Sequence, residues 1–142
     1  MPDWDAVFTT IRSLKAVRDI TFLEATAYSL ASETLTYAAG STLPAKILWR
    51  DDSLRFQRGV WQENDQASLI VWMVDLTGNK TATTTDVTEW TRKFKGMVQE
   101  GDREAYSRFT VDGQRLKARA VVPLERPDGR IYALRIILQA SE

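Results

Sequence analysis

The hydrophobic positions at the start of the chain follow a helical period. Between about residue 3 and about residue 18, Asp3 can cap a first turn and basic side chains suit the last one. This predicts an amphipathic helix whose apolar stripe either packs on the domain's own sheet or docks on a neighbouring subunit. The stripe consists of Trp4, Val7, Phe8, Ile11, Leu14 and Val17.

The spacing of apolar side chains then changes to the period of two that is typical of strands. It predicts β elements over about residues 20–76. The stretches 20–26 and 33–37 are rich in β-forming residues. The small polar segment between them predicts a hairpin connection, with a short helical turn as the alternative.

Two more strands are expected before residue 77. Gly40 and Pro44 punctuate the sequence, so the next strand is expected over residues 45–49. The most apolar stretch, residues 67–76, predicts a central strand buried on both faces. Residues 50–66 between them are rich in charge and predict a charged loop or a solvent-exposed hairpin.

A polar connector and a second helix follow. Residues 77–85, with the sequence TGNKTATTT, predict an exposed loop or a flexible hairpin tip. A helix is expected over about residues 86–98, because Asp86 can cap it and Glu89 completes a capping box. Gly101 is expected to stop this helix.

The C-terminal part of the chain predicts a β-meander over about residues 108–138. Asp112-Gly113 is its strongest hairpin signal, because a type I′ turn needs positive φ at both central residues. Pro123 is expected to end the second strand of the meander.

These elements predict a single domain over residues 1–142, without an internal repeat. A chain of this length can bury a sizeable core. We expect the α+β class, as a small antiparallel β-barrel or sandwich with an N-terminal amphipathic helix and one further helix.

Composition narrows the chemistry. The 142 residues include 19 Lys plus Arg against 19 Asp plus Glu, no His and no Cys. The missing residue types exclude disulfides and thiol nucleophiles and remove the usual general base and metal ligands. We therefore expect no catalytic residue, no metal site and no cofactor, and the protein is not expected to be an enzyme. A net charge of zero argues against direct recognition of nucleic acid.

Three other features bear on function. Carboxylates cluster at residues 51–52 and 100–104, but interleaved arginines favour solvated turns over acid–base chemistry. The longest apolar run, residues 69–74, is far shorter than the ~20 residues of a membrane helix, so no membrane partner is expected. Trp61 lies in the charged segment, where an aromatic side chain is either packed locally or an interface anchor.

The order of these parts carries a resemblance in three places. The first is the acidic and aromatic helix start at residues 3–8, and the second is the early hairpin with the strand at 45–49. The third is a C-terminal series of turns and strands: Gly101-Asp102-Arg103, residues 109–114, residues 121–123 and Asp128-Gly129. In this order the chain resembles the head–tail connectors of long-tailed bacteriophages and prophages, more narrowly the lambda-type head-completion or tail-attachment proteins that act as stoppers at the neck.

The resemblance implies a structural virion protein. Such proteins form rings at the neck, commonly of six or twelve copies, which join head to tail and help to retain packaged DNA. The implied partners are other copies of the chain, the portal or an adaptor ring, and tail-tube or tail-terminator proteins. DNA passes through the lumen without being read. The implied location is the virion neck, and the host cytoplasm during assembly.

The candidate contact residues for such a ring lie in two loops. Loops on a small barrel can meet a neighbouring subunit or the next ring. The expected interaction residues are Arg50, Asp52, Arg55, Phe56, Arg58, Trp61, Thr81 and Thr84.

Two rival hypotheses come from other functional classes. A small-ligand-binding β-barrel would be a stable monomer with an enclosed apolar cavity. Its pocket would be lined by tryptophans and by Tyr28, Tyr37, Tyr106 and Tyr132. The second rival is an enzyme that works with carboxylates and lysine.

Overall fold

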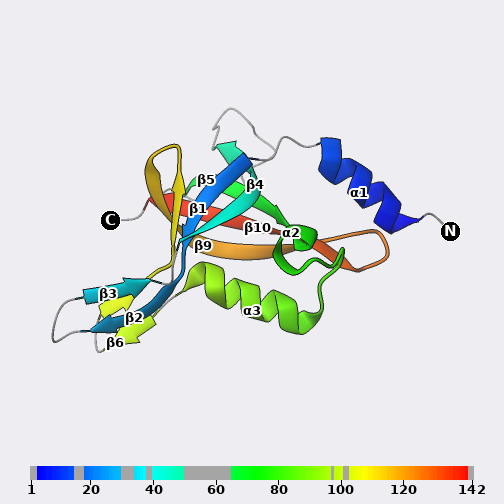
Figure 1. Cartoon of the computed structure of the whole chain (residues 1–142). Helices are drawn as coiled ribbons and strands as arrows, with labels where there is room; N and C mark the ends of the chain where they lie inside the picture. The colour runs from blue at the N-terminus through cyan, green and yellow to red at the C-terminus, as the bar shows by residue number, and fades with distance from the viewer. Residues whose placement is uncertain are drawn as a thin grey trace.

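The computed structural model describes residues 3–14, 18–29, 34–37, 40–49, 65–96, 98–100 and 103–140 (Figure 1). These residues form three helices and ten strands. In chain order they are α1 (Trp4–Leu14), β1 (Arg18–Leu23), β2 (Ala25–Ser29), β3 (Thr34–Tyr37), β4 (Ser41–Trp49), β5 (Asp65–Trp72), α2 (Met73–Thr77), α3 (Thr84–Lys95), β6 (Val98–Glu100), β7 (Arg103–Ala105), β8 (Arg108–Val111), β9 (Gln114–Glu125) and β10 (Ile131–Ala140).

Six of the strands close into a barrel in the order β1-β4-β5-β10-β9-β8, with every neighbouring pair antiparallel. The expected α+β class is therefore confirmed, as a barrel and not a sandwich. The C-terminal meander is also confirmed, because β8, β9 and β10 are neighbours in this order. Its first turn has φ of 51° at Asp112 and 80° at Gly113, which is the positive φ pair that a type I′ hairpin requires.

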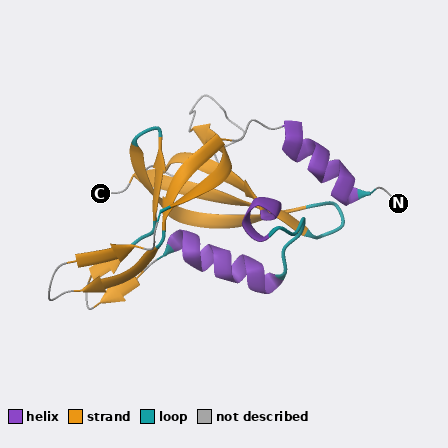
Figure 2. Cartoon of the chain, viewed as in Figure 1, coloured by secondary structure: helices purple, strands orange, loops and turns teal. Residues whose placement is uncertain are grey.

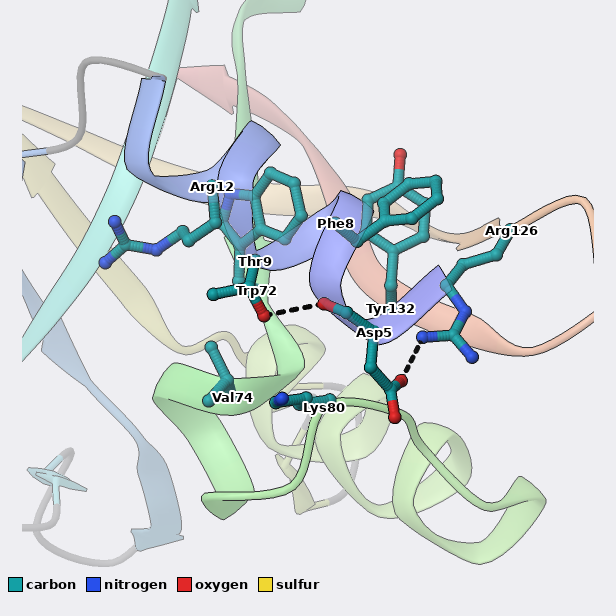
Figure 3. A pocket seen from close by; sticks show the side chains of 9 residues that line it. All are labelled: Asp5, Phe8, Thr9, Arg12, Trp72, Val74, Lys80, Arg126 and Tyr132. Carbon is teal, nitrogen blue, oxygen red and sulfur yellow. Dashed lines mark hydrogen bonds and ion pairs between the residues drawn. The ribbon is translucent and has the colours of Figure 1, made fainter. Parts of the chain in front are cut away.

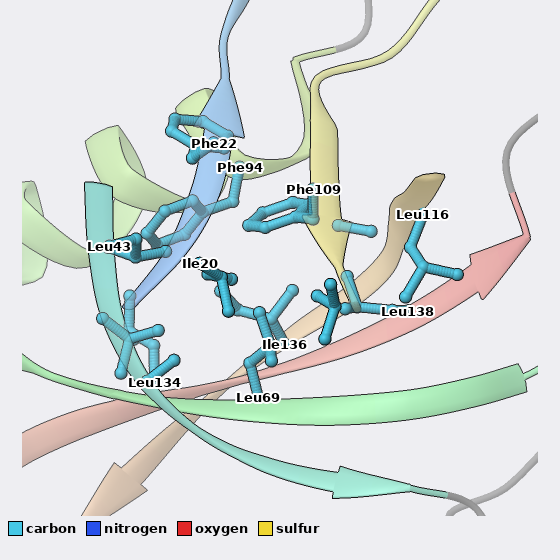
Figure 4. Packing of buried hydrophobic residues seen from close by; sticks show 14 of the residues in the cluster. Ile20, Phe22, Leu43, Leu69, Phe94, Phe109, Leu116, Leu134, Ile136 and Leu138 are labelled. Atoms are coloured by element: carbon cyan, nitrogen blue, oxygen red, sulfur yellow. The ribbon is translucent and has the colours of Figure 1, made fainter. Parts of the chain in front are cut away.

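The barrel interior is filled by large apolar side chains. Alternate residues of each strand point inward, and Leu69, Val71 and Ile136 are fully buried there. Helix α3 adds Phe94, whose ring lies 5.4 Å from that of Phe22 and 5.8 Å from that of Phe109 (Figure 4). This helix therefore closes the core and is part of it.

Two short hairpins extend from the barrel on the side away from α1 (Figure 1). Strand β2 pairs with β3, and β6 pairs with β7. Strand β2 also lies against β6 and β7, so the two hairpins form one lobe. The hairpin expected between residues 20–26 and 33–37 is only partly right, because β2–β3 begins at Ala25 and its first strand runs on through Ser29. The first part of the expected strand is β1, which ends at Leu23 and pairs with β4 and β8 in the barrel. Strands β6 and β7 were not expected from the sequence.

Both prolines that were expected to limit strands lie inside them. Pro44 is opposite Asp19 in β4, and Pro123 is opposite Leu134 in β9. Strand β5 pairs with β4 only from Lys46 onward, and β8 reaches β9 only as far as Leu116. Each proline therefore lies where its strand has one partner, so a missing N–H costs no ladder bond on the other side.

Helix α1 begins where it was expected, after Asp3, but this helix and the central strand both end earlier than expected. Helix α1 ends at Leu14, and Arg18, expected within the helix, begins β1. The strand expected over residues 67–76 stops at Trp72, where the chain turns into α2. Met73, the first residue of α2, follows the inward row of β5 and is fully buried. The change to a helix keeps that side chain in the core while the backbone leaves the sheet.

The threonine-rich connector is a tethered loop and not a hairpin tip. The Ala82 N–H donates to the Ile131 carbonyl at 2.9 Å, which ties the loop to β10. Helix α3 then begins at Thr84 with Thr83, not Asp86, as its N-cap. The Asp86 N–H donates to Thr83 Oγ1 and the Thr83 N–H donates to Asp86 Oδ2, each at 3.1 Å. This capping box lies three residues earlier than expected.

Helix α3 also ends earlier than expected, at Lys95. Gly96 has φ of 53° and is the C-cap, its N–H donating to the Arg92 carbonyl at 2.7 Å. A Cβ at Gly96 would lie 1.8 Å from Ser107 Oγ, so no other residue fits without a shift. Val98, expected at the end of the helix, begins β6 instead. Gly101, the expected stop, lies outside the described residues.

Candidate functional site

The predicted interaction residues are not brought together in the described part of the chain. Arg50, Asp52, Arg55, Phe56, Arg58 and Trp61 all lie outside the described residues. Thr81 is half-buried next to the Ala82 bridge, and Thr84 is exposed at the start of α3. Thr84 borders a shallow depression along α3 with Thr88 and Arg92.

A more developed site lies between α1 and the outer wall of the barrel, where it encloses about 110 Å³ (Figure 3). Helical spacing places four α1 residues on one wall of the site. The other wall is formed by the ends of β5 and β10, by helix α2 and the loop after it, and by the β9–β10 turn. The lining residues are Asp5, Phe8, Thr9, Arg12, Trp72, Val74, Lys80, Arg126 and Tyr132.

Three aromatic rings form the apolar part of this site. The Phe8 and Tyr132 ring centroids are 4.4 Å apart, and those of Trp72 and Tyr132 are 5.0 Å apart. Trp72 and Tyr132 are neighbours because Trp72 is paired with Ala133 in the β5–β10 ladder. Burial raises the pKa of the Tyr132 hydroxyl, so the ring stays neutral over the physiological range.

One polar atom in this apolar wall has no described partner. Trp72 is 5% exposed, and its Nε1 is buried without a hydrogen-bond acceptor among the described residues. Buried donors are nearly always paired in proteins. The indole N–H is therefore an unpaired donor directly behind the apolar wall.

An arginine holds the first of two polar links between α1 and the barrel. Arg126, with 3% of its side chain exposed, donates to the carboxylates of Asp128 at 2.7 Å and of Asp5 in α1. Hydrogen bonds from Arg126 hold the pKa of Asp5 and that of Asp128 below their ordinary value. The bond to Asp128, and then that to Asp5, raises the pKa of Arg126.

The second polar link lies two helical turns further along α1. Arg12 donates through Nε and Nη2 to the two carboxylate oxygens of Asp75 in α2, at 3.1 and 3.3 Å. Along α1, the negative Asp5 faces the positive Arg126, and two turns later the positive Arg12 faces the negative Asp75. This charge order fixes the direction of α1 on the barrel.

A separate polar cluster at the other end of β5 explains a buried charge. Asp65 is 1% exposed and accepts from Arg119 at 2.8 and 2.9 Å, and from Gln139 Nε2 at 3.2 Å. This arrangement joins β5, β9 and β10, which suits a structural role.

The carboxylates around the α1 site have arginine partners. Asp5 is paired with Arg126, and Asp75 is paired with Arg12. In the described ranges, no three or more Asp or Glu residues gather closely enough to hold a metal ion. No helix among the described residues is long and apolar enough to span a membrane.

Comparison with known proteins gives no family assignment. No protein-family model matches the sequence, and no curated protein matches it either.

Sequence reasoning found part of the α1 site. Trp72 and Tyr132 were expected as pocket residues, but inside a barrel, whereas they line a cavity on its outside. Tyr106 instead packs under Lys117 Nζ, 4.5 Å from the ring centre. The side chains of Tyr28 and Tyr37 lie outside the described residues. Asp5, Arg12 and Arg126 were missed as a set, although the i, i+7 spacing of opposite charges in α1 was a readable signal.

Proposed function

We propose that the chain is a structural protein of a tailed bacteriophage, which forms a ring at the neck, joins head to tail and helps to retain packaged DNA. The sequence resemblance to lambda-type head-completion and tail-attachment proteins is the starting point. A small barrel with an N-terminal helix is the architecture which that resemblance implies. The chain would act in the virion, after assembly in the host cytoplasm.

The filled barrel is the observation that carries this proposal. Side chains such as Leu69, Phe109 and Ile136 are fully buried in the interior, so the barrel suits a scaffold. A ligand carried within it, as in the rival hypothesis, is not favoured, because the described side chains already occupy the interior.

Projections on two sides of the scaffold suit ring formation. A ring uses a heterologous interface, in which two different surfaces of each subunit meet. Helix α1 lies on one side of the barrel and the two-hairpin lobe on the other (Figure 2). These two elements are the natural places for contacts with adjacent subunits, with the portal or adaptor ring, and with tail-tube or tail-terminator proteins.

Mass measurements test this proposal. The purified chain is examined by analytical ultracentrifugation alone, with portal rings, and with tail-tube rings of the phage or prophage that encodes it. We expect rings of six or twelve copies, either spontaneously or once a partner ring is supplied, visible by electron microscopy. Portal rings from an unrelated phage are the control. A chain that stays monomeric and binds neither partner ring contradicts the proposal.

A genetic test is independent of purification. If the gene is deleted from its phage or prophage, we expect separate tails and heads that have lost DNA, with infectivity restored by the gene in trans. Neighbouring genes for portal, major capsid and tail-tube proteins are also expected. Normal numbers of infectious particles without the gene contradict the proposal.

A further inference from the structure

The cavity under α1 is separate from the barrel core and from the two-hairpin lobe. It is formed where one face of α1 rests on Trp72, Tyr132 and α2 without filling the space between them (Figure 3). All of its lining residues belong to one chain, so the site can be occupied in a single subunit, whether or not the ring proposed above forms.

The size and walls of the cavity set the class of molecule that fits. Its volume is about 110 Å³. An apolar protein cavity of roughly 150 Å³ accepts benzene, so this smaller one, which is partly open to solvent, holds at most a single ring or a branched alkyl group whose polar end extends toward solvent. Phe8, Trp72 and Tyr132 offer aromatic faces, and Val74, 39% exposed, adds an aliphatic edge. The occupant is therefore apolar and small.

The indole of Trp72 adds a requirement for one acceptor. Its Nε1–H is buried and has no acceptor among the described residues, although the ring lines the cavity. The donor atom has no surface open to the cavity in this structure, so an occupant's oxygen pairs with it only when the indole ring turns on binding. A purely hydrocarbon occupant would leave it unpaired.

The charges around the cavity favour an anionic acceptor. Arg12 is engaged by Asp75, and Arg126 by Asp5 and Asp128. Lys80 is exposed, also lines the cavity, and has no ion pair within the described ranges. Asp5 carries the one negative charge among the lining residues described, and it shares Arg126 with Asp128 and also interacts with the charge of Lys80. Lys80 is the lining cation without an ion pair in the described ranges, so it is the group that can attract a carboxylate.

We propose that this cavity is a binding site for a small aromatic or branched aliphatic carboxylate. The apolar body lies between Phe8, Trp72 and Tyr132. The carboxylate faces Lys80 and, once the indole ring has turned toward it, accepts a hydrogen bond from Trp72 Nε1. Helix α1 forms one wall of the site, so a bound molecule bridges α1 and the barrel.

Indole N–H signals in a ¹H–¹⁵N NMR spectrum of the full chain test this site. The chain has five tryptophans, and the Trp72 signal is assigned as the one lost in Trp72→Phe. With benzoate or 4-methylpentanoate as probe, we expect a saturable shift of the Trp72 signal with a dissociation constant of about 1 mM. Acetate, which lacks the apolar body, is expected to leave the signal in place.

Three variants separate the parts of the proposal. Thr9→Phe fills the cavity from an exposed position of α1 and is expected to abolish the shift while the other indole signals persist. Lys80→Met is expected to weaken benzoate binding about two- to fivefold and to leave benzyl alcohol binding unchanged. Lys95→Met, at an exposed position of α3, is the matched control and should bind like the parent chain.

The outcomes that overturn the proposal are equally specific. An unmoved Trp72 signal at saturating benzoate, or the same shift in Thr9→Phe, shows that the cavity is not the site. An equal effect of acetate shows ionic contact alone. Benzoate binding that is unchanged in Lys80→Met removes the assignment to carboxylates. None of these results bears on ring formation, which is measured separately by mass.

Discussion

Helices α1 and α3 have similar lengths, 11 and 12 residues, and each carries an apolar stripe, but they are built into the molecule differently. Phe94 of α3 is fully buried and joins Phe22 and Phe109 in the barrel core. In α1, Phe8 is half-buried against Tyr132, and Val7 is 39% exposed. The apolar pattern indicates which face of a helix is turned inward, but not how deeply that face is buried.

The two helices also differ in the bonds that hold them in place. Helix α3 is held by main-chain and capping bonds at both ends, through Thr83, Gly96 and the bond from Ala82 to β10. Helix α1 is held on the barrel by side-chain ion pairs from Asp5 and Arg12. We infer that α3 unfolds with the barrel, whereas α1 can be released from it at lower cost.

Removing one phenylalanine from each helix should give the largest difference. Phe94→Ala leaves a cavity among three aromatic rings and is expected to lower the free energy of unfolding by about 3–5 kcal/mol. Phe8→Ala removes a half-buried ring from an outer surface, and a loss of about 1 kcal/mol is expected. Urea unfolding followed by circular dichroism measures both values. Equal losses would contradict the distinction between the two helices.

Substitution of two glycines tests whether packing at its C-terminus fixes α3 to the fold. Gly96 and Gly78 both have positive φ, 53° and 81°, but only Gly96 is crowded, because a Cβ added there would lie 1.8 Å from Ser107 Oγ. Gly78→Ala should cost about 1 kcal/mol, because only backbone strain is added. Gly96→Ala should cost about 2–4 kcal/mol, because Ser107 must also move.

The same urea titrations measure the two glycine variants. Ser107 Oγ donates to the Lys93 carbonyl at 2.8 Å and accepts from the Ala25 N–H at 3.1 Å. A shift of Ser107 therefore disturbs the place where α3, the barrel and the start of β2 meet. If the two variants lose the same stability, the packing at Gly96 contributes nothing and only φ matters.

The parts of the fold that short-range chemistry determines were predicted from the sequence. The Asp112-Gly113 turn and the meander around it follow from positive φ and a period of two. The positions of Pro44 and Pro123 were predicted wrongly, because a proline is tolerated where its strand has one neighbour, and the sheet order decides that. Thr83 with Asp86 and Asp86 with Glu89 both have the spacing of a capping box, and the structure forms the first, directly after the bond from Ala82 to β10.

The candidate site was less accessible to prediction, because its polar links join distant parts of the chain. Asp5 and Arg126 are 121 residues apart in sequence, and Arg12 and Asp75 are 63 apart. No local pattern pairs such residues. Only the order of charges within α1 was visible in the sequence. It could not indicate that the partners lie in the turn at Arg126 and in helix α2.

Loss of one N-cap from each helix should give a smaller contrast. Thr83→Ala removes the acceptor of the Asp86 N–H and should lower the free energy of unfolding by about 1 kcal/mol. Asp3 Oδ1 accepts the Ala6 N–H at 3.2 Å, but Asp3→Ala should change the global value by less than about 0.3 kcal/mol, because α1 frays without the barrel. Hydrogen exchange should locate its effect in α1. A global loss equal to that of Thr83→Ala would contradict this view.

Lowering the pH should release α1 from the barrel before α3 and should give the smallest of these contrasts. Arg126 lowers the pKa of Asp5 and of Asp128 in the folded state. Such groups stabilise the folded state at pH values above their unfolded pKa of about 4, and the contribution disappears as pH falls through the lower folded pKa. We therefore expect the indole signal of Trp4 in α1 to change at a higher pH than that of Trp90 in α3. Asp5→Asn removes one titrating group from the pair with Arg126 and should narrow the difference in pH between the two transitions. Asp86→Asn, in the α3 cap, is the control and should leave that difference unchanged. If both indole signals of the parent chain change at the same pH, α1 is as firmly integrated as α3.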